Sequence, residues 1–456
     1  MSQVPQKKRF QAIKGTRDLL PPETELWNRV ETTAREVFGT FGFGEIRPPI
    51  FEPTELFARA VGGDTDIVSK EMYSFEDRDD TSVSLRPEAT ASVCRAYIEH
   101  NMHAWTQPVK LYYIGPMFRR ERPQKGRYRQ FYQIGAEVLE TLQQGQGGPK
   151  DLAKDAAVDA EVIEMVRTFF ARLELQSVRL EINSIGHSAP VVDGKSVCRR
   201  AYVEKLKAAL IEVKDQLGED SQRRIDTNPL RVLDSKLEHE QPIIERLPRI
   251  SDHLCDDCRK NFMEVKRQLD LRGVPYKENW RLVRGLDYYM RTTFEITARG
   301  LGSQNAVCGG GRYDGLVELL GGQATKGIGF AIGEDRLILS LQEAKKGGVA
   351  AGRDVYVAWM GEKAQETAIK AAQALREAGL RVELPPVELK FGKALGQADK
   401  VGAKFALILG EDELASGQWT VKTLADGTQE KMAAGEVVEF VKRKRPEKRN
   451  SGRVKQ

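Results

Sequence analysis

The chain has few cysteines and no long apolar run. Its 456 residues include five cysteines, scattered at Cys94, Cys198, Cys255, Cys258 and Cys308. Few and scattered thiols are typical of a protein in a reducing compartment, so we expect a cytoplasmic location. No segment approaches the ~18 uninterrupted apolar residues of a membrane-spanning helix, and the N-terminus lacks the apolar core of a secretion signal. We therefore expect no membrane span and no signal peptide.

A strong excess of one charge is also missing. The formal net charge is only +5, which allows a nucleic-acid partner but gives little evidence for one. Charged residues make up 30% and hydrophobic residues 40% of the chain, which indicates a soluble globular protein long enough for two or three domains. The end of the chain from Lys442 is much more basic. We expect a disordered, solvated tail over 446–456 or, alternatively, an arm that contacts RNA.

The segment Val109–Glu140 predicts a hairpin of two strands, because apolar residues alternate with period two in both halves. The even-numbered face is expected to face the core and carries Tyr112, Ile114, Phe118, Tyr132, Ile134, Ala136 and Val138. The odd-numbered face indicates a polar platform inside a pocket, with Arg119, Glu121, Gln133, Gly135 and Glu137. We expect Gly135 to leave the backbone open to a close ligand. An ordinary hairpin with a charged tip is the alternative.

The loop of this hairpin and two later arginines are candidates for binding anions. The loop Arg122–Arg129 is basic and suited to phosphate oxygens. Arg284 stands beside Gly285 in a segment with strand character, and the alternative is a surface arginine in a strand turn. Arg336 falls in the first turn of a helix predicted from Glu334, where a cation opposes the helix dipole. Either a polyphosphate lies near Arg336, or this side chain pairs with the adjacent acids.

Two segments near the N-terminus predict helices. Glu23–Phe38 has helical spacing, and Glu45–Phe51 after it predicts a short edge strand. This pair is either a dimer surface or a plain packing unit. Ser84–Ser92 opens another helix, with Glu88 and Thr90 in its first turn, where an acid is favourable. Simple capping is therefore an alternative to a binding role for these two side chains.

Two glycine patterns imitate nucleotide sites. Gly327–Gly333 is close to a dinucleotide-binding fingerprint, but no apolar strand precedes it and its glycines look like part of a strand. Gly194–Ser196 imitates the end of a P-loop, but Ala189 stands where the first glycine belongs. We expect neither to bind a nucleotide.

Cys255 and Cys258 have the spacing of metal ligands, and Cys198 or His253 could contribute to such a site. No second CxxC pair is present in the chain. Free thiols in a helical region are the prediction, so no metal-binding residue is assigned, and a structural zinc site is the alternative.

Several of these segments resemble the motifs of class II aminoacyl-tRNA synthetases. Phe118–Glu121 with Arg129–Phe131 resembles motif 2, Glu23–Phe51 resembles motif 1, and GIGFAIGEDRL resembles motif 3. The runs FRRERPQKGRYRQFYQIGAE and LVRGLDYYMRTTFEI are similar to histidyl-tRNA synthetases in particular. The resemblance covers 14–441 in matching order. It implies an enzyme that activates histidine with ATP and Mg²⁺, esterifies the 3′ end of histidine tRNA and forms a homodimer.

The resemblance also implies roles for individual residues. Catalysis is implied for Arg119 and Arg284, and ATP binding for Arg119, Glu121, Arg127, Arg284 and Arg336. Binding of the histidine amino group is implied for Glu88, Thr90 and Gln133. Binding of the imidazole is implied for Glu137 and Tyr289, with Tyr313 lining the pocket. Tyr288 is a further candidate for an aromatic wall, because its side chain suits an imidazole. Candidates for the tRNA acceptor end are Gln124, Arg127 and Arg129. The chain departs from the family at Ala89, often glycine, and at Arg120, often histidine, which leaves one ATP contact uncertain.

The expected fold class is α+β. The resemblance implies an antiparallel sheet flanked by helices, with the catalytic core in 1–197 and 276–346. Helical runs dominate 198–275, which predicts a helical insertion, and strand character returns at Trp280–Ala298. After a glycine-rich linker at 347–352, strands and helices alternate over 353–445, which predicts a small α/β domain that resembles an anticodon-binding domain.

Two other functions fit parts of the pattern. A synthetase paralogue serves as the regulatory subunit of ATP phosphoribosyltransferase, but it lacks the C-terminal domain and loses catalytic residues, whereas this chain keeps Arg284 and Asp354–Val441. A class II synthetase for proline or threonine is the other option. The run LVRGLDYY and Glu137 argue against it.

Overall fold

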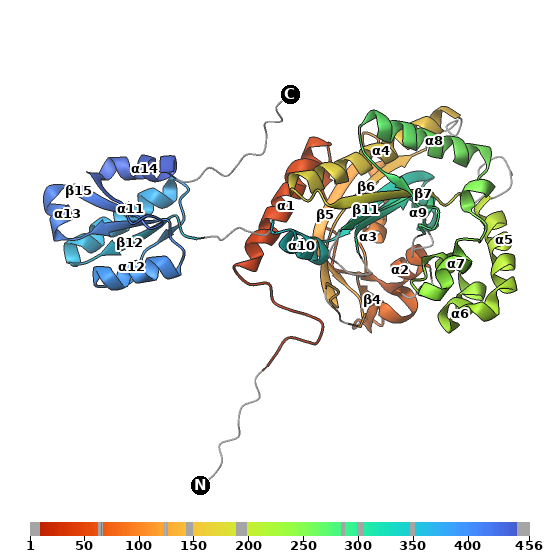
Figure 1. Ribbon diagram of the computed structural model, residues 1–456, viewed down its shortest axis with the longest axis horizontal. Coiled ribbons are helices and arrows are strands. Elements are labelled where there is room, and N and C mark those ends of the chain that lie inside the picture. The colour runs from red at the N-terminus through yellow and green to blue at the C-terminus, as the bar shows by residue number, and fades with distance from the viewer. Residues whose placement is uncertain are drawn as a thin grey trace, which may run out of the picture. The chain divides into compact units, whose positions relative to one another are not determined.

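The computed structural model describes residues 10–62, 65, 67–122, 124, 126–142, 149–187, 198–283, 288–298, 305–346 and 352–444. The chain divides into two compact units (Figure 1). The large unit runs to Gly348 and the small unit begins at Val349, while Pro21–Glu25 group with the small unit. The expected linker at 347–352, except Gly352, and the basic tail at 446–456 lie outside the described residues.

An eight-stranded sheet forms the centre of the large unit. In spatial order its strands are β1 (Gly44–Glu45), β5 (Val109–Phe118), β6 (Gln130–Thr141), β11 (Thr325–Gly333), β10 (Ala306–Arg312), β9 (Met290–Ala298), β7 (Val178–Ser184) and β8 (Lys277–Glu278). The six inner strands pair antiparallel, and only the short strands at the two edges pair parallel to their neighbours. The expected antiparallel sheet is confirmed.

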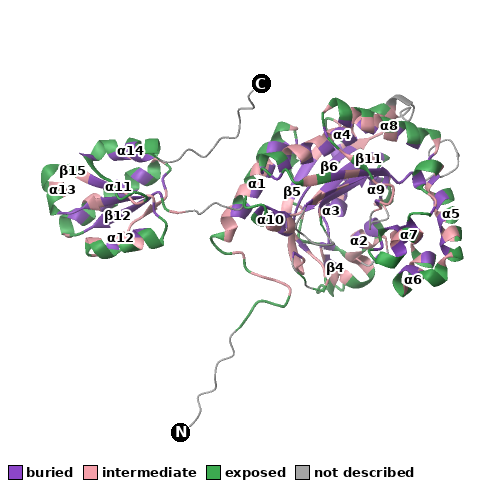
Figure 2. Cartoon of the chain, in the orientation of Figure 1, coloured by how far each residue is buried: buried purple, intermediate pink, exposed green. Residues whose placement is uncertain are grey.

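Helices cover both faces of this sheet. One face packs against α1 (Glu23–Thr40), α4 (Pro149–Arg172), α8 (Asp256–Leu271) and α10 (Glu334–Glu343). The other packs against α2 (Thr54–Val61), α3 (Thr90–Glu99) and α9 (Leu316–Leu319). Figure 2 shows buried residues along the strands and exposed residues on the outer faces of the helices. Burial of apolar surface between these layers is the main favourable term in folding.

The hairpin prediction is confirmed for the strand pair and corrected in detail. Tyr112, Ile134, Ala136 and Val138 are buried on the expected face, and Ile114 and Tyr132 pack against them. The other face is not uniformly polar, because Leu111, Tyr113, Met117 and Leu139 join the second apolar cluster. β5 ends at Phe118, so Arg119 and Glu121 lie beyond the strand rather than on it. The backbone pairing of β5 with β6 still extends one residue beyond the strand ends, since the Arg119 N–H donates to the Arg129 carbonyl.

Three other boundaries differ from the sequence-based expectation. The edge strand expected over Glu45–Phe51 is two elements, β1 and β2 (Phe51–Pro53), and β2 belongs to a separate sheet with β3 (Tyr73–Glu76) and β4 (Ser82–Leu85). The run Gln143–Leu152, rich in glutamine and glycine, predicts a loop, whereas helix α4 already begins at Pro149. In the described part of Trp280–Ala298, strand structure starts only at Met290.

Helices dominate the region 198–275, as expected. It contains α5 (Cys198–Glu212), α6 (Glu219–Thr227), α7 (Gln241–Ile244) and several 3-10 turns around an apolar cluster of their own. These three helices lie together at one side of the large unit (Figure 1). Helix α8 also packs on α4 and the sheet through Val265 and Leu269. The helical region is therefore fastened to the core along α8.

The small unit is an α/β domain built on a five-stranded sheet with the strand order β13-β12-β14-β15-β16. Its elements are β12 (Val355–Trp359), α11 (Glu362–Glu377), β13 (Val382–Glu383), α12 (Phe391–Lys400), β14 (Phe405–Leu409), α13 (Glu411–Ser416), β15 (Gln418–Thr423), β16 (Gln429–Ala433) and α14 (Val437–Lys444). This agrees with the alternation of strands and helices expected over 353–445. Among the described residues, no helix combines the length and apolar character needed to cross a membrane.

A buried ionic network ties α4 to the inner strands. Arg312 is nearly inaccessible to solvent; its Nη2 lies 2.5 Å from Asp159 Oδ1 and its Nη1 lies 2.9 Å from Asp314 Oδ1. Lys326 pairs with Asp155 at 2.9 Å in the same network. Removing one partner of a buried ion pair leaves the other charge uncompensated, which is strongly destabilising.

Asp159→Ala should lower the free energy of unfolding of the large unit by about 3 kcal/mol, because Arg312 would lose its closest carboxylate. Urea titration of the full-length protein measures this change. Asp220→Ala, which removes the exposed partner of Arg223, is the matched control and should cost less than ~1 kcal/mol. Equal shifts in the two variants would contradict the prediction.

Candidate functional site

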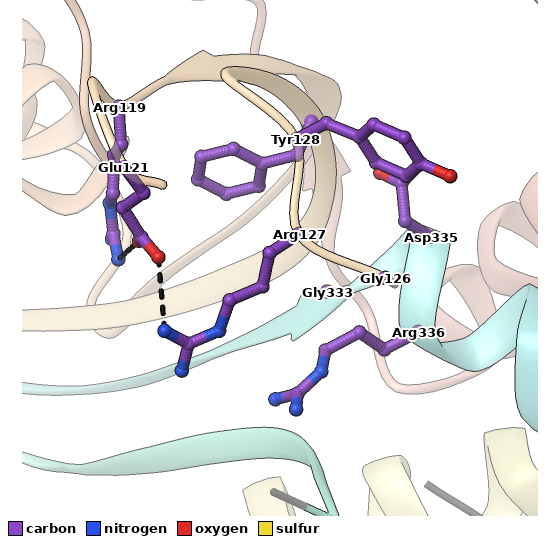
Figure 3. A pocket seen from close by; sticks show the side chains of 9 residues that line it. Arg119, Glu121, Gly126, Arg127, Tyr128, Gly333, Asp335 and Arg336 are labelled. Carbon is purple, nitrogen blue, oxygen red and sulfur yellow. Dashed lines mark hydrogen bonds and ion pairs between the residues drawn. The ribbon is translucent and has the colours of Figure 1, made fainter. Parts of the chain in front are cut away.

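A pocket rich in arginine opens between the hairpin loop and the start of α10 (Figure 3). Its lining residues are Arg119, Glu121, Gly126, Arg127, Tyr128, Phe131, Gly333, Asp335 and Arg336. The guanidinium groups of Arg127 and Arg336 point into the same space. Glu121 accepts from Arg127 at 3.0 Å and lies 3.9 Å from Arg119. We call these nine residues the arginine pocket.

Arg336 is held at the start of α10, as expected. Its Nη1 donates to the Ala306 carbonyl on β10 at 2.7 Å. Burial, followed by the positive charge of Arg127, lowers the pKa of Arg336. The neighbouring Asp335 pairs with Arg17 at 3.1 Å and accepts from the backbone N–H of Tyr132. Because two guanidinium groups approach each other here, an anion between them would relieve their repulsion.

Arg119 is one of the residues that line the arginine pocket. Its Nε donates to the Pro87 carbonyl at 3.0 Å, and its guanidinium lies 5.3 Å from the centre of the Phe131 ring. Burial is the largest effect on the pKa of Glu88 and raises it, while hydrogen bonds from Ala91 and Thr90 and, to a smaller extent, the positive charge of Arg119 lower it. Arg119 is therefore close enough to act electrostatically on the segment that starts α3.

A second group of polar side chains surrounds Glu137, which lies on strand β6. Glu137 is buried and accepts from Tyr313 at 2.6 Å and from Thr90 at 2.8 Å, with Tyr113 at 3.5 Å. The ring of Tyr288 lies 4.7 Å from that of Tyr289 and 5.7 Å from that of Tyr313. We call Glu137, Thr90 and these four tyrosines the Glu137 cluster.

Burial controls the ionisation of Glu137. Loss of solvent raises its pKa to about 8, and the hydrogen bonds from Tyr313 and Thr90 offset only part of this effect. The negative charge of Glu88 acts in the same direction as burial. A carboxyl group with this pKa keeps its proton at neutral pH until a ligand supplies a donor or a positive charge. Perturbed carboxyl groups of this kind are typical of binding sites.

Glu88 caps α3. Its two carboxylate oxygens accept from the backbone N–H groups of Thr90 and Ala91 at 2.6 and 3.1 Å. Glu88 thus precedes the helix, which starts at Thr90, rather than standing within its first turn. The capping interpretation is correct, and Thr90 at the start of the capped helix also donates its hydroxyl to Glu137. Capping and the placement of a polar pocket are therefore not alternatives here.

Gln133 lies on β6 between the two groups. Across the sheet it pairs in register with Gly115 on β5 and Gly333 on β11. Its side chain is buried, and Oε1 has no hydrogen-bond partner among the described residues. A buried acceptor without a partner costs free energy unless a ligand supplies a donor. Phe131, Gln133 and Glu137 share one face of the strand, which spans roughly 20 Å over these six steps.

Two glycines on β11 make room for the Glu137 cluster, a role that the sequence did not reveal. A Cβ atom at Gly329 would lie 1.7 Å from Glu137 Oε2, and one at Gly327 would lie 2.2 Å from the Tyr313 ring. The glycines that imitate a dinucleotide fingerprint therefore belong to a strand, as expected. Gly135 has a different role from the one predicted, because the Tyr113 ring, rather than a ligand, occupies the space beside it.

The structure brings most of the predicted site residues together. Arg119, Glu121, Arg127 and Arg336 line the arginine pocket, while Glu88, Thr90, Glu137, Tyr288, Tyr289 and Tyr313 form or adjoin the Glu137 cluster. Gln124 and Arg127 bridge each other within the hairpin loop, and Arg129 follows them. Arg284 lies outside the described residues, as do Ala189 and Gly194–Ser196. Tyr113 was missed, although it has the same parity as the platform residues.

Comparison with known proteins gives a consistent result. The model of the histidyl-tRNA synthetase family matches residues 15–337, and that of the anticodon binding domain matches 354–444. The chain belongs to the histidyl-tRNA synthetase family. It is 52% identical over 439 residues to a histidine--tRNA ligase of Koribacter versatilis, covering 95% of this chain and 96% of the relative. A second histidine--tRNA ligase, of Solibacter usitatus, is 51% identical over 94% of this chain and 98% of the relative.

Solved structures of the histidyl-tRNA synthetase family share the fold. The apo histidyl-tRNA synthetase of S. aureus matches with a TM-score of 0.75 and 36% identity, covering 95% of this chain and 100% of that chain. A protein from Bacillus halodurans described as an ATP phosphoribosyltransferase regulatory subunit/histidyl-tRNA synthetase matches with a TM-score of 0.60 and 20% identity. The second likeness concerns the fold alone.

Gly329→Ala should disrupt the Glu137 cluster, because the added methyl group would overlap the Glu137 carboxyl. We expect histidine-dependent ATP–pyrophosphate exchange to fall by at least about tenfold, the equivalent of ~1.4 kcal/mol. Gly39→Ala in α1 is the control, since a Cβ there meets nothing within 4 Å. Unchanged exchange in Gly329→Ala, with the protein folded, would refute this role of the glycine.

Proposed function

We propose that this chain forms histidyl-adenylate from histidine and ATP and then transfers histidine to the 3′ end of histidine tRNA. The main support is the arrangement along β6. A buried carboxyl suited to an imidazole and Phe131, which lines the arginine pocket suited to phosphates, lie roughly 20 Å apart along one face of this strand. The names of the relatives, histidine--tRNA ligase, agree with this proposal.

The first step brings two anions together, so it requires fixed cations. The substrate carboxylate attacks the α-phosphorus of ATP, a new P–O bond forms, and pyrophosphate leaves with the electron pair of the broken P–O bond. Arg119 is proposed at the α-phosphate, because it reaches from the arginine pocket toward Pro87 and Glu88. Arg284 is proposed as a second cation from its motif alone. Preorganised guanidinium groups stabilise the charge that develops in such a transition state.

The remaining pocket residues are proposed to hold ATP. Arg127 and Arg336 face the same space and would bind the distal phosphates, while Glu121 orients Arg127. ATP binds as its Mg²⁺ complex, in which the ion neutralises phosphate oxygens. The Glu121 carboxylate fits this ion in donor type and position, since it lines the arginine pocket.

Histidine is proposed to bind along β6. Glu137 would accept from an imidazole N–H, with Tyr289 beside it and Tyr288 and Tyr313 as walls. Gln133 Oε1, which has no partner in the described part of the chain, would receive the ammonium group together with Glu88 and Thr90. A pocket built on hydrogen bonds rejects substrates that lack the matching groups by large factors.

The tRNA is proposed to contact both units. Gln124, Arg127 and Arg129 on the hairpin loop are candidates for the acceptor end. The small unit, 353–445, would read the anticodon, as the matching domain family suggests. Homodimerisation through α1 and the adjoining strands, and a cytoplasmic location, are further parts of this proposal. They follow from family resemblance and from the small number of cysteines.

ATP–pyrophosphate exchange measured with each of the twenty amino acids tests the proposed function directly. We expect exchange with histidine alone. Exchange with proline or threonine would redirect the proposal to another synthetase. No exchange with any amino acid by the folded protein would favour a regulatory role of the kind named for the Bacillus halodurans protein.

The pKa of Glu137 predicts how histidine binding depends on pH. The empty site keeps Glu137 protonated below about pH 8, whereas accepting from a neutral imidazole requires the carboxylate. Binding should therefore release a proton, so the KM for histidine should fall by up to about tenfold per pH unit as pH rises from 7 toward 8. Above pH 7 the free imidazole is already mostly neutral, since its usual pKa is about 6.5.

Glu137→Gln supplies the control for this pH dependence. The variant cannot ionise at this position, so its KM for histidine should be higher and nearly constant over the same range. The KM for ATP should change little in either protein. The same pH trend in the variant and the parent protein would show that another group is responsible.

A further inference from the structure

Four side chains of metal-ligand type converge away from the site described above. His187 follows β7, Cys198 is the first residue of α5, and Cys255 and Cys258 stand at the start of α8. One donor atom from each lies within 4.8 Å of every other. His187, Cys198 and Cys258 are buried, and Cys255 is half-buried. Ten residues separate His187 from Cys198 and 56 separate Cys198 from Cys255, so only the fold brings these segments together.

The distances match a tetrahedron around a single ion. Zinc lies about 2.3 Å from thiolate sulfur and about 2.05 Å from imidazole nitrogen, which gives tetrahedral edges of about 3.8 Å between sulfurs and about 3.5 Å between sulfur and nitrogen. The Sγ atoms of Cys198 and Cys258 are 3.8 Å apart. His187 Nδ1 lies 3.2 Å from Cys258 Sγ, 3.3 Å from Cys198 Sγ and 3.8 Å from Cys255 Sγ.

Two local features support this arrangement. The Cys258 backbone N–H donates toward Cys255 Sγ at 3.5 Å, a contact that favours a thiolate. Gly186 has φ +65°, and a Cβ atom there would lie 2.8 Å from Cys198 Sγ. A glycine is therefore needed beside His187 for Cys198 to approach. A disulfide does not explain the cluster, because the two sulfurs at 3.8 Å are far beyond the length of an S–S bond, about 2.05 Å.

We propose that His187, Cys198, Cys255 and Cys258 bind one structural zinc ion. Three thiolates and an imidazole are ligands that select zinc among the common divalent ions. The protein fills all four positions, so no site remains for a substrate or an activated water. The site is thus closed and structural, in contrast to a catalytic zinc site.

The position of the proposed zinc site indicates that the ion would stabilise the junction between the helical region and the sheet. It would join the end of β7 to α5 and α8, and so fasten the helical region to the sheet. Next to Cys198, Arg199 donates from its backbone N–H to the His187 carbonyl and from Nη1 to the Tyr289 carbonyl at 2.6 Å. The segment that carries Cys198 and Arg199 therefore also supports the Glu137 cluster, because Arg199 contacts Tyr289. Tyr289 here is positioned by Arg199, not by the ion itself.

Metal analysis of the full-length protein, purified without chelators, tests the proposal. We expect one equivalent of zinc per chain, measured by inductively coupled plasma mass spectrometry. Replacement by Co²⁺ should give the intense red-region bands and near-ultraviolet charge-transfer bands of a tetrahedral thiolate site. Both measurements are independent of catalytic activity, so a negative result would count against the zinc site and not against the proposed aminoacylation.

Cys255→Ser removes the least buried ligand and should lower the bound zinc to well under half an equivalent, with a reduced Tm. Cys94→Ser and Cys308→Ser are matched controls, because these buried cysteines lie in the apolar clusters of the sheet. Both controls should keep the full equivalent. If Cys255→Ser fails to fold, the zinc content and cobalt spectrum of the parent protein still decide the question.

Three results would overturn the proposal. One is a reduced, folded parent protein that contains no zinc and takes up none when Zn²⁺ is added. Another is an equal loss of zinc in Cys94→Ser and Cys255→Ser, which would show that the metal is adventitious. The third is a disulfide between two of the proposed ligands in protein prepared under reducing conditions.

Discussion

The hydrogen bonding of the buried Glu137 carboxyl group is the interaction on which the rest of the site depends. This carboxyl group lies in a layer between sheet and helices where an isolated charge is costly, and hydrogen bonds from Thr90 and Tyr313 compensate only in part. Each of those donors comes from a different segment. The start of α3, the strand β6 and the segment after β10 must therefore hold their positions together for the site to exist.

Antiparallel pairing supplies this precision. Glu137 on β6 faces Gly329 on β11 in register, and a shift of one residue would turn Glu137 toward the opposite face. The absence of a side chain at Gly329 is what allows a carboxyl group above the neighbouring strand. The same strand β6 carries Phe131 into the arginine pocket. One rigid element thus sets the distance between the part suited to an imidazole and the part suited to phosphates.

The helical region extends the same principle. Its own apolar cluster gives it local stability, while α8 and the four proposed zinc ligands connect it to the sheet. Arg199 continues this connection to Tyr289, at the edge of the Glu137 cluster. A region that sequence patterns describe only as helical is therefore linked to the Glu137 cluster by a defined contact.

The amino-acid sequence by itself determined the main elements and most of the site residues. Periodicity of two placed Glu137 and Gln133 on one strand face, helical spacing placed α1, and family motifs named the arginines, because these signals are local. Tertiary structure alone decided which distant residues meet. It showed that Gly329 accommodates Glu137, that Tyr113 fills the space beside Gly135, and that His187, rather than His253, joins Cys198, Cys255 and Cys258. Such contacts depend on strand register and helix packing between segments far apart in the chain, and these are set by burial of the whole core rather than by any local pattern.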